Sequence, residues 1–285
     1  MNNDISPIIK PNELVLLQQE AELILIDTSN GPNAKENYEK KHLAGALYVD
    51  LNTQLADIKA DVSIGGRHPL PTLEQFSETL TSLGITPSSH VVIYDDKNGS
   101  NAAARFWWML KSIGHQKVQV LDGGFEDAIK AGFPANSNTV IPLRKEPYKV
   151  EKWFLPLADI AEVESASEDS NYLIIDVRDP ERFSGVKEPI DLIAGHIPGA
   201  INIPLTTNLD SNGFFLSPEE LRSKYSKAFG TIKEENRIVH CGSGVTACHT
   251  LLALAYAGIA IPKLYVGSWS EWSRNNKPIA TINKK

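Results

Sequence analysis

The chain carries its most informative pattern in Ile238-Val-His-Cys-Gly-Ser-Gly-Val-Thr-Ala-Cys248, near the end of its 285 residues. The β-branched pair Ile238-Val239 predicts a short buried strand that ends at His240. Residues 241–246 are rich in glycine and predict a turn, and the residues from Ala247 onward favour a helix. The pattern therefore places a cysteine between the C-terminal end of a strand and the N-terminus of a helix.

This position favours a reactive cysteine at residue 241. Gly242 and Gly244 can adopt positive φ at little cost, which lets backbone amides turn toward the sulfur of Cys241. Such amides, together with the positive end of the helix dipole, favour the thiolate. A lone cysteine is otherwise most often a small buried apolar residue, and we expect that of Cys248, which lies inside the predicted helix. We interpret Cys241 as a nucleophile.

Three motifs resemble the rhodanese superfamily. The first is the loop Cys241–Ala247, and the others are Gly267-Ser-Trp269 followed by Glu271-Trp272, and Ala194-Gly-His-Ile-Pro-Gly-Ala-Ile-Asn-Ile-Pro204. The resemblance covers nearly the whole chain, and the loop, which is a specific motif, is most similar to that of the 3-mercaptopyruvate sulfurtransferase family. The resemblance implies an enzyme that carries sulfur on a cysteine as a persulfide.

Length and composition indicate a globular protein with two domains of ordinary size. Hydrophobic residues make up 42% of the chain and charged residues 22%, which is typical of such proteins. The net charge of −7 argues against a general binder of nucleic acid or of anionic membranes. No apolar run approaches the roughly 20 residues that span a bilayer.

The N-terminus and the cysteines bear on the compartment. Met1-Asn-Asn-Asp-Ile-Ser6 lacks a basic segment that leads into an apolar stretch, so no secretory signal is expected. Two cysteines, one in a loop and one in a helix, do not form a disulfide framework. We therefore expect a cytoplasmic, reduced protein, in which a free thiolate persists.

The two halves of the chain repeat the same pattern. The matched segments are Leu23–Asp27 with Tyr172–Asp176, His42–Ala46 with His196–Ala200, His90–Tyr94 with Asn236–His240, and Gly123–Phe125 with Gly267–Trp269. Strands that alternate with helices predict an α/β fold, here two rhodanese-like domains, each a mainly parallel sheet with helices on both faces. We expect domains at 1–137 and 152–285, joined by a proline-containing linker at 138–151.

The repeat is broken at the cysteine. Asp95, in the loop Tyr94–Ser100, stands where the second half has Cys241. A carboxylate cannot carry sulfur as a persulfide, so we expect the first domain to be inactive in transfer. We also expect it to lend residues to the active site, because concave sites prefer domain interfaces.

Two arginines follow the first strand of the second half, where an open α/β sheet places its ligand site. The family resemblance implies that Arg182 binds the carboxylate of the substrate, and the fork of a guanidinium suits that role. For Arg178 we prefer a structural salt bridge. A second arginine of the family falls at Ile190 in this chain, which is a departure from the pattern.

Most histidines are expected to be structural. His42 and His196 occupy matched positions before a glycine, which indicates a shared turn, and His240 should be buried and hydrogen-bonded. His68 differs, because it lies in a loop rich in glycine and proline. By resemblance we assign it a catalytic role together with Ser243. The acidic partner of the family falls at Asn52, which can orient an imidazole without balancing its charge.

These residues predict a transfer of sulfur in two steps. Cys241 attacks a small-molecule sulfur donor, and the amides of residues 242–246, with Gly242, Gly244, Val245 and Thr246 as binding residues, hold the charge on the outer sulfur. A thiol or a thioredoxin-like protein then removes the sulfur. Covalent catalysis of this kind needs no metal and no cofactor.

Alternatives remain at the level of sequence. The loop contains no Lys or Arg, which favours 3-mercaptopyruvate over the divalent anion thiosulfate, although Ile190 weakens that choice. A cysteine-dependent phosphatase would need a longer loop that closes with arginine, whereas Ala247 stands at the end of this one. A non-catalytic rhodanese-like module would have an unreactive thiol.

Overall fold

The computed structural model describes residues 5–20 and 22–282, and the chain divides into two compact units. Unit 1 consists of Met1–Asp57 and Pro71–Phe154, and unit 2 of Ile58–Leu70 and Leu155–Lys285. The short segment 58–70, which the sequence assigns to the first domain, thus has its contacts in unit 2. No helix among the described residues is long and apolar enough to cross a bilayer.

Unit 1 is built on a five-stranded parallel sheet with the order β1-β6-β5-β2-β4. The strands, in sheet order, are Ile8–Ile9, Val118–Leu121, His90–Tyr94, Leu23–Asp27 and Leu47–Tyr48. A separate antiparallel pair joins β3, His42–Leu43, to β7, Ala135–Asn136. The strands predicted at Leu23–Asp27 and His90–Tyr94 are both confirmed.

Unit 2 repeats this sheet. Its order β8-β12-β11-β9-β10 is again parallel throughout. The strands are Leu157–Ala158, Lys263–Tyr265, Arg237–His240, Leu173–Asp176 and Ile201–Asn202. Each strand corresponds to one of unit 1 in both chain order and sheet order, so the internal repeat expected from the sequence extends to the whole topology.

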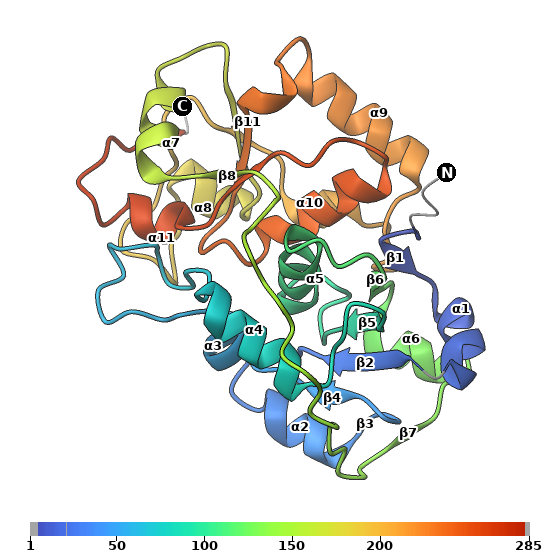
Figure 1. Ribbon diagram of the computed structural model, residues 1–285. Helices are drawn as coiled ribbons and strands as arrows, with labels where there is room; N and C mark the ends of the chain where they lie inside the picture. The colour runs from blue at the N-terminus through green and yellow to red at the C-terminus, as the bar shows by residue number, and fades with distance from the viewer. Residues whose placement is uncertain (1–4, 21, 283–285) are drawn as a thin grey trace. The chain divides into compact units, whose positions relative to one another are not determined.

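Helices surround both sheets (Figure 1). In unit 1 they are α1 Pro11–Leu16, α2 Ala34–Lys40, α3 Leu51–Gln54, α4 Leu73–Ser82, α5 Ala102–Ser112 and α6 Gly124–Lys130, with a 3₁₀ turn at Leu17–Gln19. In unit 2 they are α7 Ile160–Ser167, α8 Pro180–Ser184, α9 Pro218–Phe229, α10 Ala247–Tyr256 and α11 Ser268–Trp272, with 3₁₀ turns at Leu205–Asn208 and Glu234–Asn236. This is the mainly parallel α/β architecture predicted from the sequence.

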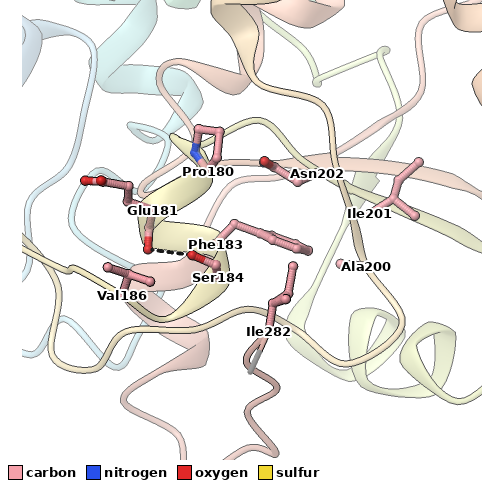
Figure 2. A pocket seen from close by; sticks show the side chains of 9 residues that line it. All are labelled: Pro180, Glu181, Phe183, Ser184, Val186, Ala200, Ile201, Asn202 and Ile282. Atoms are coloured by element: carbon pink, nitrogen blue, oxygen red, sulfur yellow. Dashed lines mark hydrogen bonds between the residues drawn. The ribbon is translucent and has the colours of Figure 1, made fainter. Parts of the chain in front are cut away.

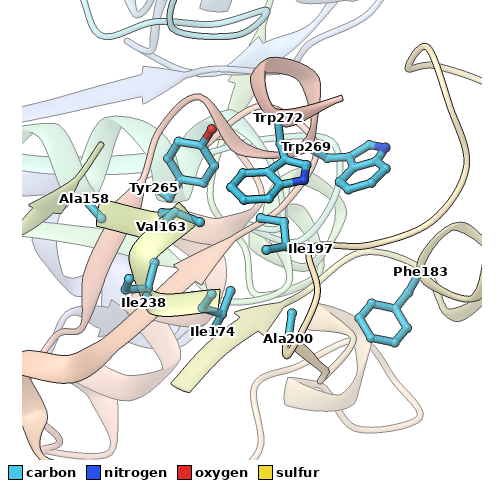
Figure 3. Packing of buried hydrophobic residues seen from close by; sticks show 11 residues of the cluster. Ala158, Val163, Ile174, Phe183, Ile197, Ala200, Ile238, Tyr265, Trp269 and Trp272 are labelled. Carbon is cyan, nitrogen blue, oxygen red and sulfur yellow. The ribbon is translucent and has the colours of Figure 1, made fainter. Parts of the chain in front are cut away.

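The central strand β11 carries the chain to the cysteine loop. Ile238 and Val239 are fully buried, because β11 lies between β9 and β12 and both of its edges are paired. Ile238 packs in a core cluster of unit 2 that also contains Trp269 and Trp272 of α11 (Figure 3). The helix after the loop ends at Tyr256, just before Gly258, whose φ of +70° ends the helical path.

The matched histidines have the same structural role in both units. His42 stacks on Tyr38, and its Nδ1 lies 2.7 Å from the carbonyl oxygen of Tyr38. His196 stacks on Phe183, and its Nδ1 lies 2.7 Å from the carbonyl oxygen of Phe183. Each ring therefore joins the chain to an aromatic residue on the preceding helix, which is the shared local structure expected from the repeat.

Candidate active site

The loop after β11 is compact and enclosed. Only 1% of the surface of Cys241 is exposed, and Ser243 and Val245 are nearly as buried. Gly244 has a φ of +70°, and a Cβ at this position would lie 2.5 Å from the carbonyl oxygen of Val266. No side chain fits there without displacing backbone, so the sequence of the loop is fixed by its close packing.

The N-terminal turn of α11 holds this loop. The hydroxyl of Ser268 accepts hydrogen bonds from the amides of Cys241 at 3.2 Å and Gly244 at 3.0 Å, and donates to the carbonyl of Tyr265. The next two amides of α11 donate to the carbonyl oxygens of Cys241 and Gly242. The later motif, Gly267-Ser-Trp269, therefore serves to anchor the cysteine loop.

Several amides of the loop remain without a protein acceptor. Within the described part of the chain, the N–H groups of Gly242, Ser243, Val245 and Thr246 donate to no backbone or side-chain group. Buried backbone donors are nearly always paired. Four unpaired donors in one loop next to a cysteine are the arrangement that an anion would complete.

The corresponding loop of unit 1 contains its own anion. Asp95 is fully buried, and its Oδ1 accepts hydrogen bonds from the amides of Lys97 and Gly99, both at 2.9 Å. Its Oδ2 accepts from the amides of Asn101 at 3.1 Å and Ala103 at 3.2 Å. Burial raises the pKa of Asp95 above its ordinary value, and these bonds oppose that shift. The carboxylate thus fills the position that a sulfur would take.

The structure brings His68 and Ser243 together. His68 is half-buried in the segment 58–70 of unit 2, and its Nδ1 lies 2.8 Å from the hydroxyl of Ser243. The amide of Arg67 donates to the hydroxyl of Ser270 at 3.0 Å, which ties this segment to α11. The hydroxyl two residues along the chain from Cys241 is therefore hydrogen-bonded to an imidazole.

Asn52, the residue at the position of the family's acidic partner, belongs to unit 1, whereas His68 and Ser243 belong to unit 2. Asn52 is an exposed residue of α3 in unit 1, and its amide donates to the carboxylate of Asp50.

Arg178 has the structural role that the sequence favours. Its side chain is 1% exposed and donates to Asp176, to Glu188 and to the carbonyl oxygen of Gly195. The guanidinium also lies over the ring of Trp269, 4.6 Å from its centroid. These contacts of Arg178 are all with residues of unit 2.

Arg182 belongs to a second group of charges beside the loop. Its guanidinium binds Glu188 and, at 3.0 Å, Asp191. Asp191 also binds Arg67 through two hydrogen bonds, and Arg274 lies 3.4 Å from it. Although burial alone would raise the pKa of Glu188, bonds from Arg182 and from backbone amides hold it below the ordinary value. Glu188 is therefore ionised near neutral pH.

Sequence reasoning did not identify Arg67, Asp191 or Arg274 as parts of this site. Arg67 directly precedes His68 and Asp191 directly follows Ile190, so both are next to residues that the motifs single out. Their pairing joins segments 124 positions apart, and nothing in the local pattern of either segment indicates it.

His240 is a buried neutral residue. Its Nδ1 lies 3.2 Å from the carbonyl oxygen of Cys241, and burial lowers the pKa of its ring. Its Nε2 lies 3.7 Å from the carboxylate of Asp176 and has no hydrogen-bond partner among the described residues.

Unit 2 also has a pocket that no residue of the cysteine loop lines. Figure 2 shows a pocket beside α8 and β10, lined by apolar side chains such as Phe183, Val186, Ile201 and Ile282. None of the predicted site residues lines it. Within the described residues no group of His, Cys, Asp and Glu is placed to hold a metal ion.

Comparison with known proteins assigns both halves of the chain to one family. The model of the rhodanese-like domain matches residues 10–131 and again 159–275. The chain belongs to the rhodanese family. Both halves of the chain are rhodanese-like domains, which confirms the two domains of this family expected from the sequence.

Relatives of the whole chain carry the names of two enzymes. The chain is 39% identical over 275 residues to a probable 3-mercaptopyruvate sulfurtransferase of Pseudomonas aeruginosa, covering 95% of this chain and 93% of the relative. It is 34% identical to the thiosulfate sulfurtransferase of Mus musculus, covering 88% and 84%. A solved 3-mercaptopyruvate sulfurtransferase from Leishmania major has a TM-score of 0.81 at 28% identity, covering 94% of this chain and 75% of that one.

Replacing Asp95 by Asn should destabilise unit 1. An amide can accept through one oxygen only, so two of the four buried N–H donors would face an NH₂ group. We expect a loss of about 2–4 kcal/mol in the free energy of unfolding, measured by urea denaturation. Asp96→Asn, at the exposed next residue, is the control and should change stability little; equal effects of the two variants would contradict this account.

Ser268 has a φ of +53°, which is unfavourable for a side chain. Ser268→Ala keeps this strain and loses the hydroxyl, whereas Ser268→Gly loses the hydroxyl but relieves the strain. We expect both variants to be less stable than the parent, with the alanine variant lower by about 1 kcal/mol. Thermal melting of the parent and both variants tests this: an alanine variant as stable as the parent would refute the anchoring role, and one more stable than the glycine variant would contradict the strain.

Proposed function

We propose that this protein is a sulfurtransferase that moves a sulfane sulfur from 3-mercaptopyruvate to a thiol acceptor through a persulfide on Cys241. The observation that carries the proposal is the loop of residues 241–246, which combines a cysteine with four amides that have no protein acceptor. A persulfide anion is the ligand that this loop would hold, since its terminal sulfur carries a negative charge.

The first step transfers one sulfur atom. The thiolate of Cys241 attacks the sulfur of 3-mercaptopyruvate, an S–S bond forms, and the C–S bond of the donor breaks. The electron pair of the broken bond stays on the donor carbon as an enolate, and the thiol proton of the donor moves to that carbon. The products are pyruvate and an anionic persulfide, and the total charge is unchanged.

His68 and Ser243 are placed to handle the proton. Because the ring of His68 lies 2.8 Å from the hydroxyl of Ser243, the pair can accept a proton from the donor thiol and return it to the enolate carbon. Asn52 cannot supply a carboxylate for this pair, so we assign the proton transfer to the imidazole and the hydroxyl alone.

The second step discharges the persulfide. A thiolate of the acceptor attacks the outer sulfur of the persulfide, and the Cys241 thiolate leaves with the electron pair of the S–S bond. We propose a small thiol or a thioredoxin-like protein as this acceptor. Cys241 is not in a disulfide in the structure, as its role as leaving thiolate and attacking nucleophile requires.

Thiosulfate is the second candidate donor, because relatives of similar identity are named thiosulfate sulfurtransferases. The loop itself contains no Lys or Arg, and this absence favours 3-mercaptopyruvate over thiosulfate. Arg67 and Arg182 approach the loop from elsewhere, and a Cβ at Gly242 would lie 3.0 and 3.4 Å from their terminal nitrogens. The formal charge of the whole cluster therefore bears on the choice of donor. The cluster has four arginines and three carboxylates, which leave one positive charge: Arg67, Arg178, Arg182 and Arg274 with Asp176, Glu188 and Asp191. A single carboxylate balances that charge, whereas the divalent anion exceeds it.

Cys241→Ser should abolish the persulfide. When the purified protein is incubated with 3-mercaptopyruvate, intact mass spectrometry should show the parent protein heavier by one sulfur atom and the serine variant unchanged. Cys248→Ala removes the other thiol from inside α10 and should still gain sulfur. A Cys241→Ser variant that gains sulfur from the donor would exclude Cys241 as the carrier.

Ser243→Ala and His68→Gln should separate the two donors. Transfer from thiosulfate releases sulfite and moves no proton, whereas transfer from 3-mercaptopyruvate does. We expect kcat with 3-mercaptopyruvate to fall by about a hundredfold in either variant, with a much smaller effect on kcat with thiosulfate. Steady-state assays with both donors test this, and an equal loss with both would contradict a role in proton transfer.

A further inference from the structure

The charged cluster beside the loop is more than a set of internal salt bridges. The side chain of Arg178 is buried and donates its hydrogen bonds to groups within the protein. Arg67 and Arg182 each donate to the same carboxylate, Asp191. The side chain of Asp191 is fully buried, while those of Arg67 and Arg182 are 24% and 15% exposed. The shared carboxylate thus fixes two guanidinium groups side by side and leaves both in contact with solvent.

Both guanidinium groups point at the residue next to the nucleophile. A Cβ at Gly242 would lie 3.0 Å from Nη2 of Arg67, 3.4 Å from Nη2 of Arg182 and 3.5 Å from the carboxylate of Asp191. Glycine at this position therefore lets the two guanidinium groups pack directly against the loop. In the described residues, the Nη1 atoms of Arg67 and Arg182 have no protein acceptor.

We propose that Arg67 supplies a second guanidinium, beside Arg182, that binds the carboxylate of the sulfur donor. The family pattern expects a second arginine at residue 190, but this chain has an exposed isoleucine there. Arg67 reaches the same charge cluster from the segment 58–70, which also carries His68. One short segment would then both bind the donor and move its proton.

The charge of the cluster defines the ligand class. Four arginines and three carboxylates leave one positive charge among the described side chains of this cluster. A compound with one carboxylate whose carbon lies one or two bonds from a carbon that bears sulfur or a leaving group matches that charge and the proximity to Cys241. Charge-assisted pairs of guanidinium and carboxylate are short and directional, so they would also orient the reacting carbon.

Alkylation of Cys241 tests this without sulfur transfer. Iodoacetate carries a carboxylate and iodoacetamide is its neutral analogue, so the ratio of their rates at Cys241 measures the anion site. We expect Arg67→Gln to lower this ratio about tenfold, the effect of losing one charge-assisted contact. Peptide mapping separates Cys241 from Cys248, and Arg144→Gln, at an exposed arginine of unit 1, should leave the ratio unchanged.

The ratio cancels differences in protein concentration, and the ratio measured for the urea-denatured parent gives the value that unfolded protein would show, so a less stable Arg67→Gln still gives an answer. Arg67→Lys keeps the charge but not the fork and should give an intermediate ratio. In the sulfurtransferase assay Arg67→Gln should raise KM for 3-mercaptopyruvate more than it lowers kcat. The inference rests on the proposed function for its substrate, but the two can fail separately.

A ratio in Arg67→Gln equal to that of the parent overturns the role of Arg67, even if sulfur transfer is confirmed. A lowered ratio in a protein that transfers no sulfur would support the anion site and refute the proposed function.

Discussion

Backbone N–H groups that follow the end of a central parallel strand must find an acceptor, because burial without one costs free energy. In both units of this protein the chain turns after such a strand, and several amides of the turn make no hydrogen bond to the backbone of the described residues. Unit 1 meets the requirement with Asp95, whose two oxygens accept four amide hydrogens. Unit 2 has a cysteine at that place and four amides without a protein partner, so its loop is complete only when an anion is present.

The sequence predicts the scaffold well because the scaffold is local and repeated. β-branched runs such as Ile238-Val239 are buried on both faces of a parallel sheet, and glycines mark the turns that follow. The internal repeat then indicates that the two sheets share one topology, whereas the strand order itself comes from the structure. The cysteine loop, its anchoring motif and the pair of matched histidines all follow from patterns that span fewer than a dozen residues.

The charged cluster could not be predicted in the same way. Arg67 and Asp191 meet because the segment 58–70 packs with unit 2, far along the chain from its own neighbours in sequence. A motif search identifies His68 by its glycine- and proline-rich loop and Arg182 by resemblance, but neither method places a guanidinium from one segment against a carboxylate from another. The same long-range contact changes the argument about donors, because the loop itself contains no cation and the structure supplies two.

The two loops differ in the arrangement of their amide donors as well as in the residue, Asp95 or Cys241, that follows the strand. The Asp95 carboxylate spans two groups of donors, with Lys97 and Gly99 on one oxygen and Asn101 and Ala103 on the other. A single sulfur atom at residue 95 could reach only one of these groups, and the other would be left buried without an acceptor. The loop of unit 1 is also longer, so its amides are spaced for a planar carboxylate rather than for a spherical anion. Restoring a cysteine to unit 1 would therefore not restore the site, because the backbone around Asp95 has become specific for the side chain that fills it.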